Sequence, residues 1–336
     1  MLPPPDALRF MINGFWVSQA LYVAATLGLA DLLRDGRKTV DELANAVSAH
    51  APSLHRLLRV LASVGVFAED TDGRFGLTPL AEYLRTDVAG SHRAWAIWSG
   101  QPSTWAMWGE LLHCTRSGEA GFSKAYGKSI WEYYAEHPDQ NAIFNAAMTG
   151  TSRVVTQAIV RSANLSSSTT VVDVGGGQGA LIAAALESHP AMRGILFDQP
   201  HVVAGARELL EAAGVASRCE LIAGNFFESV PERGDTYLLK SMLQDWDDPH
   251  AVAILRNCRR AMEAGARLLV IERVIPPGND FHPSKLGDLL MLVMYGGRVR
   301  SEREFTQLYA DAGFNLKSTT AIAEGAGLSI IEGSLV

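Results

Sequence analysis

Apolar and polar positions follow two different patterns along the chain. In the first half, apolar residues recur at helical spacing, whereas in the second half short apolar runs alternate with helical segments. Residues 8–33 hold more apolar side chains than one buried face of a solvated helix can use. We therefore expect part of this surface to meet another subunit.

The next segments have the order helix, helix, hairpin. Thr39 and Glu42 have the spacing of a capping box and predict a short helix that ends near Val47, and a second helix is expected over roughly residues 53–64. Residues 65–69 and 74–78, joined by a turn that contains an Asp-Gly pair, predict a short hairpin. This is the order of a winged helix.

A winged helix suggests a DNA-binding regulator, which is the main non-enzyme hypothesis. Phosphate binding requires a stripe of basic residues. The second helix offers only Arg56 and Arg59, and acids and bases nearly balance between Lys38 and Arg93. The charge pattern therefore favours a winged helix that serves packing and dimerisation.

The apolar runs of the second half predict a parallel, doubly wound sheet. They lie at residues 170–174, 194–197, 219–223, 236–239 and 267–271, with helical segments between them. A last pair lies near residues 316–322 and 328–335. Because a parallel crossover needs a dozen residues or more, and the loop within this pair is much shorter, the last two strands must pair antiparallel.

A glycine-rich turn follows the first of these strands. Gly175, Gly177 and Gly179 allow the backbone to approach a ligand closely, and a helical segment begins directly after them. Asp198 ends the next apolar run, where a carboxylate can accept hydrogen bonds from both hydroxyls of a ribose. The pattern predicts a ligand that contains adenosine.

Two such ligands are compatible with the glycines, because residues 175–180 also satisfy the loose dinucleotide pattern Gly-x-Gly-x-x-Gly/Ala. Asp173 discriminates between them. It lies two residues before the first glycine, at a position that is usually apolar in dinucleotide folds. The resulting Asp-x-Gly-x-Gly-x-Gly resembles the first motif of the class I S-adenosylmethionine-dependent methyltransferases, which favours that cofactor over NAD.

Composition is that of an ordinary enzyme of two domains, since the chain has 336 residues and ~150 residues is a usual domain length. A net charge of −7 gives no overall attraction for nucleic acid or an anionic membrane, and we expect neither partner. Three scattered cysteines without metal-ligand spacing indicate reduced thiols and no metal site. No apolar stretch reaches the ~18 residues of a membrane span, and we expect a soluble, cytoplasmic protein.

Three segments are expected along the chain. Residues 1–100 should form a helical and winged-helix dimerisation domain, residues 101–163 a helical pocket segment, and residues 164–336 the cofactor-binding domain, with the serine run at 164–169 as a linker. Aromatic residues are frequent between 91 and 160. A single aromatic residue is more often part of a core, but as a group they imply a pocket that stacks on a flat, apolar substrate.

Over nearly its whole length the chain resembles the dimeric small-molecule O-methyltransferases of the plant caffeate and hydroxyindole type and their bacterial secondary-metabolite relatives. The resemblance rests on linked motifs in the correct order and on the antiparallel end of the sheet. The motifs lie at residues 171–179, 197–202, 224–228, 239–246, 271–273 and 296–300. It implies a homodimer with an α/β fold, in which a mostly helical winged-helix domain precedes a Rossmann-like methyltransferase sheet.

The resemblance also implies site residues. At the methionine half of the cofactor, Asp173 should hold the amino group, and Gly175 and Gly177 should approach closely. Lys240 should lie near the cofactor's carboxylate and sulfonium. Asp198 should hold the ribose, and Asn225 and Phe226 should border the adenine. The expected walls of the acceptor pocket are Trp105, Phe144, Met148, Asp288, Met291 and Met294.

The chain departs from the family at its base. Where the family has His-Asp-Trp, whose His removes the proton from the acceptor, this chain has Gln244-Asp245-Trp246, and Gln cannot act as a base. One of the two acids that support that His is replaced by Val299, while the other remains as Glu272. Asn225 stands where the family usually has Asp, although its amide oxygen can still accept a hydrogen bond from adenine.

A base is needed only if the nucleophile carries its proton at the working pH. We therefore expect a methyltransferase for a small polycyclic or heteroaromatic metabolite, acting on oxygen more than on nitrogen, in which Gln244 orients the acceptor. A relocated base remains open, with His113, His250 and Tyr295 as candidates. The second hypothesis keeps the cofactor for a non-methylating reaction such as hydroxylation, decarboxylation or a pericyclic step, and the DNA-binding regulator is third.

Overall fold

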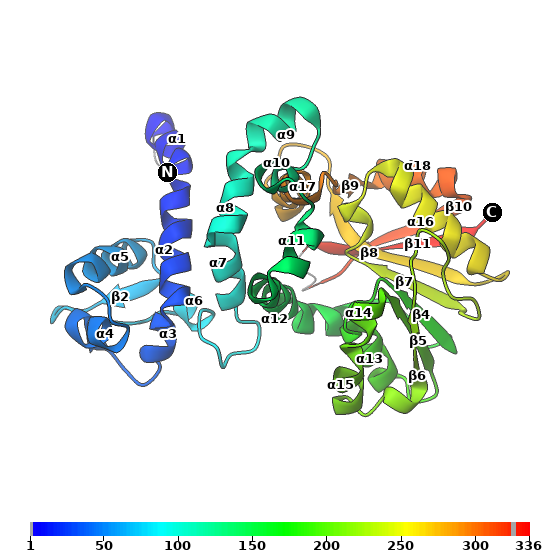
Figure 1. Ribbon diagram of the computed structural model, residues 1–336, viewed down its shortest axis with the longest axis horizontal. Coiled ribbons are helices and arrows are strands. Elements are labelled where there is room, and N and C mark those ends of the chain that lie inside the picture. Colours follow the sequence, from blue (N-terminus) through cyan, green and yellow to red (C-terminus); the bar gives the residue numbers. More distant parts are fainter. Residues whose placement is uncertain (1–2, 324–326) are drawn as a thin grey trace. The chain divides into compact units, whose positions relative to one another are not determined.

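The computed structural model describes residues 3–323 and 327–336, with the backbone alone over residues 149–154 (Figure 1). The chain forms two compact units, Met1–Gly109 with Trp131–Ser152, and Glu110–Ile130 with Arg153–Val336. The expected pocket segment 101–163 is thus divided between them. The serine run at 164–169 is not the linker that its composition suggested. It lies inside the second unit, because Leu165 is buried there in one apolar cluster with Val171.

The first unit confirms the winged-helix order. Its elements are α1 (Pro4–Ile12), α2 (Gly14–Thr26), α3 (Leu29–Leu32), β1 (Lys38–Thr39), α4 (Val40–Ala46), α5 (Ala51–Ser63), β2 (Phe67–Glu69), β3 (Arg74–Leu77) and α6 (Pro79–Glu82). The capping box of Thr39 and Glu42 is present. Strand β1 goes beyond the prediction, and it pairs with β3 so that the small sheet has the order β1-β3-β2.

Apolar residues of the first helices divide into a buried set and an exposed set. Leu29 and Leu33 are buried with Leu43, Leu58 and Phe75, which joins α3, α4, α5 and the hairpin into one core. By contrast, large apolar side chains of α1 and α2 are exposed within the unit: Leu8, Phe10, Met11, Ile12, Phe15 and Trp16. The apolar residues that exceed one buried helix face over residues 8–33 therefore form an exposed apolar surface.

The first unit also contains helices α7 (Arg93–Gly100), α8 (Pro102–Gly109), most of α11 (Ile130–Glu136) and the first part of α12 (Pro138–Ser162). Aromatic residues join them. The Trp98 indole N–H donates to the Tyr134 hydroxyl over 2.9 Å, and the Phe144 ring stacks on Tyr134 with their centroids 5.0 Å apart. These three side chains are buried and form a core.

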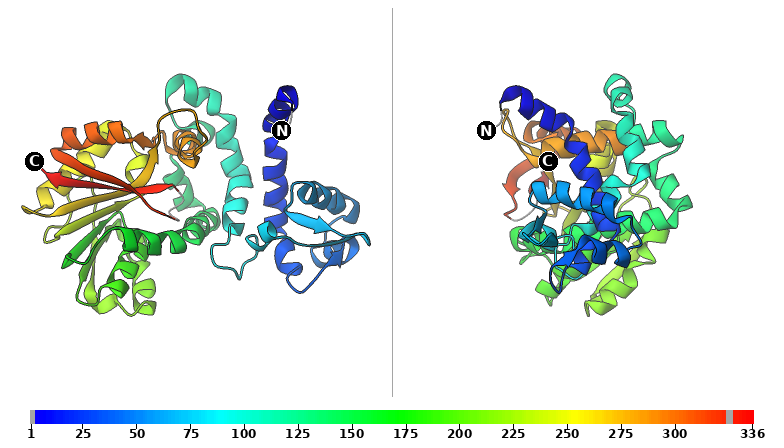
Figure 2. Two further views of the ribbon diagram at one scale, coloured as in Figure 1. Left: turned by 180° about the vertical axis from the view of Figure 1, so that it is seen from behind. Right: turned by 90° about the vertical axis from the view of Figure 1, so that its left-hand side faces the viewer.

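The second unit contains the predicted sheet, with strand order β10-β11-β8-β7-β4-β5-β6 and β9 pairing beside β8. The strands are β4 (Thr170–Val174), β5 (Arg193–Asp198), β6 (Cys219–Ala223), β7 (Thr236–Lys240), β8 (Arg267–Ile275), β9 (Arg300–Ser301), β10 (Phe314–Ala321) and β11 (Leu328–Leu335). β4 to β8 are parallel, and β11 is antiparallel to both β8 and β10. Figure 2 shows the edge pair β10 and β11 from behind.

Helices cover both faces of this sheet (Figure 1). One face packs on the end of α12 and on α13 (Ala180–Ser188) and α15 (Ala206–Ala212), and the other packs on α16 (Asp248–Ala261) and α18 (Glu302–Ala312). The unit also contains α9 (Leu111–Ser117), α10 (Gly121–Tyr126), α14 (Pro200–Val203), α17 (Pro283–Tyr295) and the 3-10 turns η1 (Ala216–Arg218) and η2 (Leu243–Asp245). The carboxyl ends of β4, β5, β7 and β8 meet at one edge, where α/β sheets bind ligands.

No helix among the described residues has both the length and the apolar composition needed to cross a membrane. In the same residues, no group of three or more His, Cys, Asp or Glu side chains is arranged to hold a metal ion. Cys114, Cys219 and Cys258 are free thiols.

Candidate active site

The glycine turn after β4 is tied to the end of β5. Gly175, Gly177 and Gly179 all adopt a positive φ, between 61° and 82°, which residues with a Cβ rarely adopt. The Gly177 N–H donates to one Asp198 carboxylate oxygen over 2.8 Å, while the other oxygen accepts from the Gln199 N–H over 2.7 Å. Asp198 thus shapes the turn and keeps further lone pairs for a ligand hydroxyl.

Two ionisable side chains, Asp173 and Lys240, lie close to each other at this edge. Asp173 is 1% exposed, and neither oxygen of its carboxylate has a hydrogen bond from any described residue. Burial raises the pKa of Asp173 to about 7, and the positive charge of Lys240 limits the rise. Burial also lowers the pKa of Lys240, which the charges of Asp173 and Glu272 partly oppose. A buried carboxylate and a partly buried ammonium of this kind suit the ammonium and the carboxylate of an amino acid, which is the methionine end of S-adenosylmethionine.

Asn225 follows β6 and has its carboxamide engaged. Its amide oxygen accepts from the Phe227 N–H over 3.0 Å, and its amide nitrogen donates to Glu228 over 3.1 Å. The oxygen keeps a second lone pair, so the expected hydrogen bond from adenine remains possible. The ring of Phe226 lies 6.2 Å from that of Trp246, edge to face, in one aromatic group with Phe227 and His250.

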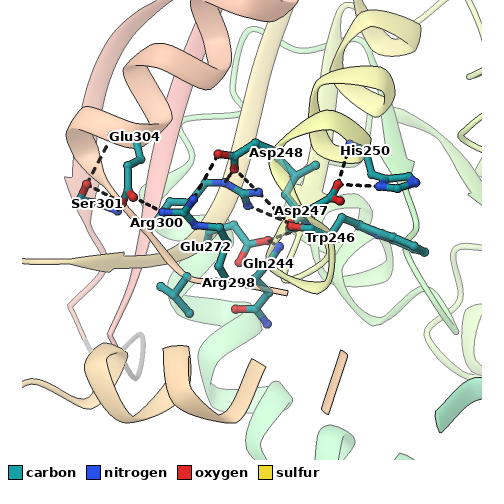
Figure 3. Close-up of polar contacts among 12 residues, drawn as sticks. Gln244, Trp246, Asp247, Asp248, His250, Glu272, Arg298, Arg300, Ser301 and Glu304 are labelled. Carbon is teal, nitrogen blue, oxygen red and sulfur yellow. Dashed lines mark hydrogen bonds and ion pairs between the residues drawn. The ribbon is translucent and has the colours of Figure 1, made fainter. Parts of the chain in front are cut away.

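Gln244 lies on η2, directly after β7, and its backbone is held on both sides (Figure 3). One carboxylate oxygen of Glu272 accepts from the Leu243 N–H over 2.9 Å and from the Gln244 N–H over 3.4 Å. The Gln244 carbonyl accepts from the Arg298 backbone N–H over 2.8 Å. Glu272 therefore supports the backbone of the turn, in contrast to the side-chain support that the family motif implies for its His.

Gly297 approaches this turn so closely that a side chain has no space. A Cβ at Gly297 would lie 2.2 Å from the Gln244 carbonyl oxygen and 2.8 Å from the Asp245 carbonyl carbon. Both neighbours are backbone atoms, which cannot rotate away. The packing of this loop on η2 thus depends on glycine.

The Gln244 side chain, by contrast, is held less firmly than its backbone. It is 8% exposed, and its amide oxygen is buried without a hydrogen bond from the described residues. In Figure 3 the carboxamide projects away from the charged group formed by Asp248, Arg298, Arg300 and Glu304. A held backbone with an unengaged carboxamide is the arrangement expected of a residue that orients a ligand.

Glu272 keeps one oxygen without a partner. It is 1% exposed, and its second carboxylate oxygen accepts no hydrogen bond from any residue that the structure describes. Burial raises the pKa of Glu272 to about 7, whereas the Gln244 N–H and the charge of Arg300 oppose the rise. Val299, in the place of the family's second acid, is buried and supplies no charge.

The six expected pocket residues are divided between the two units. Trp105, Phe144 and Met148 belong to the first unit, and Asp288, Met291 and Met294 lie on α17 in the second. Trp105 is 39% exposed and its ring contacts Phe15. The Asp288 carboxylate accepts from the Val299 N–H over 2.8 Å, so it supports the loop beside η2. Their joint role in one pocket stays a prediction.

The two histidines considered as relocated bases both interact with carboxylates. The His113 ring lies 3.0 Å from the Glu119 carboxylate, and His250 lies 2.5 Å from Asp247, the residue that caps α16. The His250 ring also belongs to the aromatic group of Trp246 and Phe227. Both histidines thus have structural partners.

Sequence reasoning assigned no role to Gly297, Arg298 and Arg300, although their segment is one of the motifs that carry the resemblance. The sequence signal that could have identified them is a Gly-Gly pair followed by two arginines that flank Val299, directly after an apolar segment. Only the structure shows that these residues contact the turn of Gln244.

Comparisons with known proteins identify the family of the chain. Family models match for an O-methyltransferase domain over residues 108–315 and for an O-methyltransferase dimerisation domain over residues 10–87. The chain is similar to the phenazine O-methyltransferase PhzM of Lysobacter antibioticus, with 45% identity over 98% of this chain and 96% of that protein. It is also similar to the mitomycin biosynthesis 6-O-methyltransferase of Streptomyces lavendulae, with 40% identity over 95% of this chain and 92% of that protein.

A solved structure extends the likeness to the fold. NcsB1, an O-methyltransferase from neocarzinostatin biosynthesis in complex with S-adenosylmethionine and 2-hydroxy-5-methyl naphthoic acid, superposes with a TM-score of 0.82 at 35% identity, covering 95% of this chain and 96% of that chain. The fold class, the enzyme class and the cofactor expected from the sequence are confirmed. The chain belongs to the S-adenosylmethionine-dependent O-methyltransferase family.

Proposed function

We propose that this protein transfers a methyl group to a small polycyclic or heteroaromatic metabolite, at oxygen more than at nitrogen, and that it does so without a dedicated base. The proposal rests on Gln244. Its backbone is held by Glu272 and Arg298, while its amide oxygen accepts no hydrogen bond from the described residues. An amide neither gains nor loses a proton near neutral pH, so this group can orient an acceptor but cannot deprotonate it.

We assign the cofactor residues from the hydrogen bonds and charges of each side chain. The carboxylate of Asp173, which accepts no hydrogen bond from the described residues, and the ammonium of Lys240 match the amino-acid end of the cofactor, and Asp198 at the glycine turn matches its ribose. Phe226 and the second lone pair of Asn225 would border the adenine. When bound, the cofactor supplies an electrophilic methyl group on a sulfonium.

The protein's own contribution would be orientation and the exclusion of water. Holding a nucleophile in line at near-attack distance can supply up to about 7–11 kcal/mol of barrier reduction. Gln244 would donate a hydrogen bond from its amide nitrogen to an anionic acceptor oxygen, or accept one from a neighbouring ring substituent. Glu272 would hold the turn and so fix the direction of that hydrogen bond.

The acceptor class follows from the missing base. An ordinary phenol, with a pKa of ~10, is mostly protonated at pH 7 and needs a base. An acidic phenol, a carboxylate or a ring nitrogen already offers a lone pair. The relatives named for phenazine and mitomycin, and the naphthoic acid bound to NcsB1, support a fused aromatic ring system.

We further propose that the protein works as a homodimer in the cytoplasm, without nucleic acid or membrane partners. The match to a dimerisation domain and the exposed apolar side chains of α1 and α2 support the homodimer. Free thiols at Cys114, Cys219 and Cys258 suit a reducing compartment.

Single-turnover methyl transfer from labelled cofactor, measured with hydroxylated and nitrogen heteroaromatic acceptors of different pKa, tests the proposal. For Gln244→Ala we expect a loss of roughly one or two powers of ten in rate, whereas loss of a true base costs 10²- to 10⁴-fold. The rate should follow the pKa of each acceptor. A protein-derived limb that stays near pH 6.5 with every acceptor and disappears in His113→Ala or His250→Ala would contradict the proposal. Bound cofactor that is never spent would favour a non-methylating reaction.

A further inference from the structure

The side chain of Arg300 spans the turn that carries Gln244. It is 1% exposed. One terminal nitrogen of its guanidinium donates to the Leu243 carbonyl over 3.0 Å, and the other donates to the Trp246 carbonyl over 2.9 Å. The Nε–H donates to Asp248 over 2.9 Å. The guanidinium therefore holds the residue before Gln244 and the residue two positions after it.

Together with Glu272, Arg300 leaves the turn little freedom. Glu272 accepts from the N–H groups of Leu243 and Gln244, and Arg300 donates to the carbonyls on either side. Both residues come from neighbouring strands, since β9 begins with Arg300 and pairs with β8, which contains Glu272. The donor Arg300 and the acceptor Glu272 thus lie on two paired strands, β9 and β8.

Stability alone gives a weak reason for this guanidinium. Removing a cation from water is unfavourable, and a buried ion pair is often no more stable than well-packed apolar side chains. The only carboxylate paired with Arg300 in the described residues is Asp248, whose side chain is 50% exposed. What Arg300 does supply is geometry, because the planar guanidinium donates from three separate nitrogens to two carbonyls and a carboxylate, whereas a lysine ammonium has all its donors on one nitrogen.

We propose that Arg300 is a positioning residue for methyl transfer, which fixes the backbone of Leu243–Trp246 and thereby the place where the Gln244 carboxamide meets the acceptor. This inference rests on the proposed function of Gln244. A misplacement of about 1 Å can cost on the order of 10²-fold in rate. Loss of the clamp should therefore reduce kcat, while the cofactor residues on β4, β5 and β7 keep their places.

Arg298 offers a matched control. It also pairs with Asp248, over 3.2 Å, and with Glu304, yet its side chain makes no hydrogen bond to the turn. Its backbone N–H, which does contact Gln244, is retained in any substitution other than proline. Arg298→Met thus removes a charge from the same ion-pair group without removing the clamp.

The test compares Arg300→Met, Arg300→Lys and Arg298→Met in two measurements. The first is amide hydrogen exchange of the peptide that covers residues 242–246 in the full-length protein. We expect faster exchange at this peptide in both Arg300 variants and unchanged exchange in Arg298→Met. This measurement needs no acceptor, and unchanged exchange in both Arg300 variants would overturn the proposal.

The second measurement is a double-mutant cycle with Gln244→Ala, using kcat, the KM for the acceptor and the Kd for the cofactor. Arg300→Met should lower kcat on the order of ten- to hundredfold in the parent and only about threefold or less in Gln244→Ala, because the two residues act on one contact. Arg300→Lys should fall between Arg300→Met and the parent, and the Kd for the cofactor should stay the same. Equal losses in both backgrounds would mean a merely structural role.

A failure of the proposed function gives a different result. If the parent enzyme leaves bound cofactor unspent with every acceptor, the proposed reaction fails while the exchange comparison still decides whether Arg300 clamps the turn. If Arg300→Met does not fold, Arg300→Lys carries both measurements. In either case exchange of the peptide that covers residues 242–246 must be the same in the control Arg298→Met as in the parent.

Discussion

Cofactor affinity should depend on pH through Asp173. Burial raises the pKa of this carboxyl to about 7 when no ligand is bound, so half of the molecules carry a protonated Asp173 at pH 7. To accept hydrogen bonds from the cofactor's ammonium, the carboxyl must be ionised. An adjacent positive charge lowers the pKa of a carboxyl. Binding should therefore release a proton below pH 7, and affinity should rise with pH.

The magnitude follows from the protonated fraction. With a pKa of about 7 in the free protein and full ionisation in the complex, the dissociation constant should fall about 16-fold between pH 5.5 and pH 7, or about 1.6 kcal/mol. At pH 6 about 0.9 protons should leave for each cofactor bound. Above pH 8 this dependence should vanish.

Calorimetric titration with S-adenosylhomocysteine in two buffers of different ionisation enthalpy counts the released protons directly. Asp173→Asn, which keeps the shape but cannot ionise, is the control. It should bind more weakly at pH 7 by about 1.5–3 kcal/mol, the scale of a hydrogen bond to a charged group, and it should release no proton in this range. If Asp173→Asn still releases the same number of protons, another group titrates and the assignment of Asp173 is wrong.

Three further predictions concern the turn and the dimer. Gly297→Ala should lower stability by about 1–3 kcal/mol in urea unfolding and reduce kcat, because its Cβ would meet the Gln244 carbonyl at 2.2 Å; parent-like stability would refute the close approach. Burial raises the pKa of Glu272 to about 7, so the native state holds an extra proton between about pH 4.5 and 7, and the free energy of unfolding should fall as pH rises through that window. Glu272→Gln should reduce this fall in urea unfolding of the ligand-free protein. An unchanged pH dependence in the variant would refute the assignment to Glu272. Met11→Glu, at a side chain that is 75% exposed in the single chain, should shift the mass by light scattering from dimer to monomer, whereas a monomeric parent at low micromolar concentration would refute the dimer.

Local patterns in the sequence were enough to predict the helices and strands and the class of protein. Strands β4, β6 and β11 begin and end at the predicted residues, because each is a short apolar run bounded by a turn or a helix. The capping box at Thr39 and the antiparallel pairing of β10 with β11 depend on spacing alone, and both are confirmed. The glycine motif predicted the cofactor for the same reason, because the role of Gly175 and Gly177 depends on their own backbone conformation.

Contacts between distant segments could be decided only by the tertiary structure. Composition marked the serine run at 164–169 as a linker, yet burial of Leu165 places that run within the second unit. The sequence predicted Asp288 only as a pocket residue, and the structure adds that its carboxylate accepts a hydrogen bond from the Val299 backbone. Neither fact has a local signature.

The setting of Gln244 shows the same limit at the site. The sequence predicted that a base is missing, because that depends on which residue occupies the motif. It could not predict that Glu272 and Arg300 hold the backbone on both sides of Gln244, since these residues lie 28 and 56 positions further along the chain. Residue types and their local spacing determine the elements and the available chemistry, whereas the orientation of a side chain depends on backbone contacts that form only when β8 and β9 pair beside the turn.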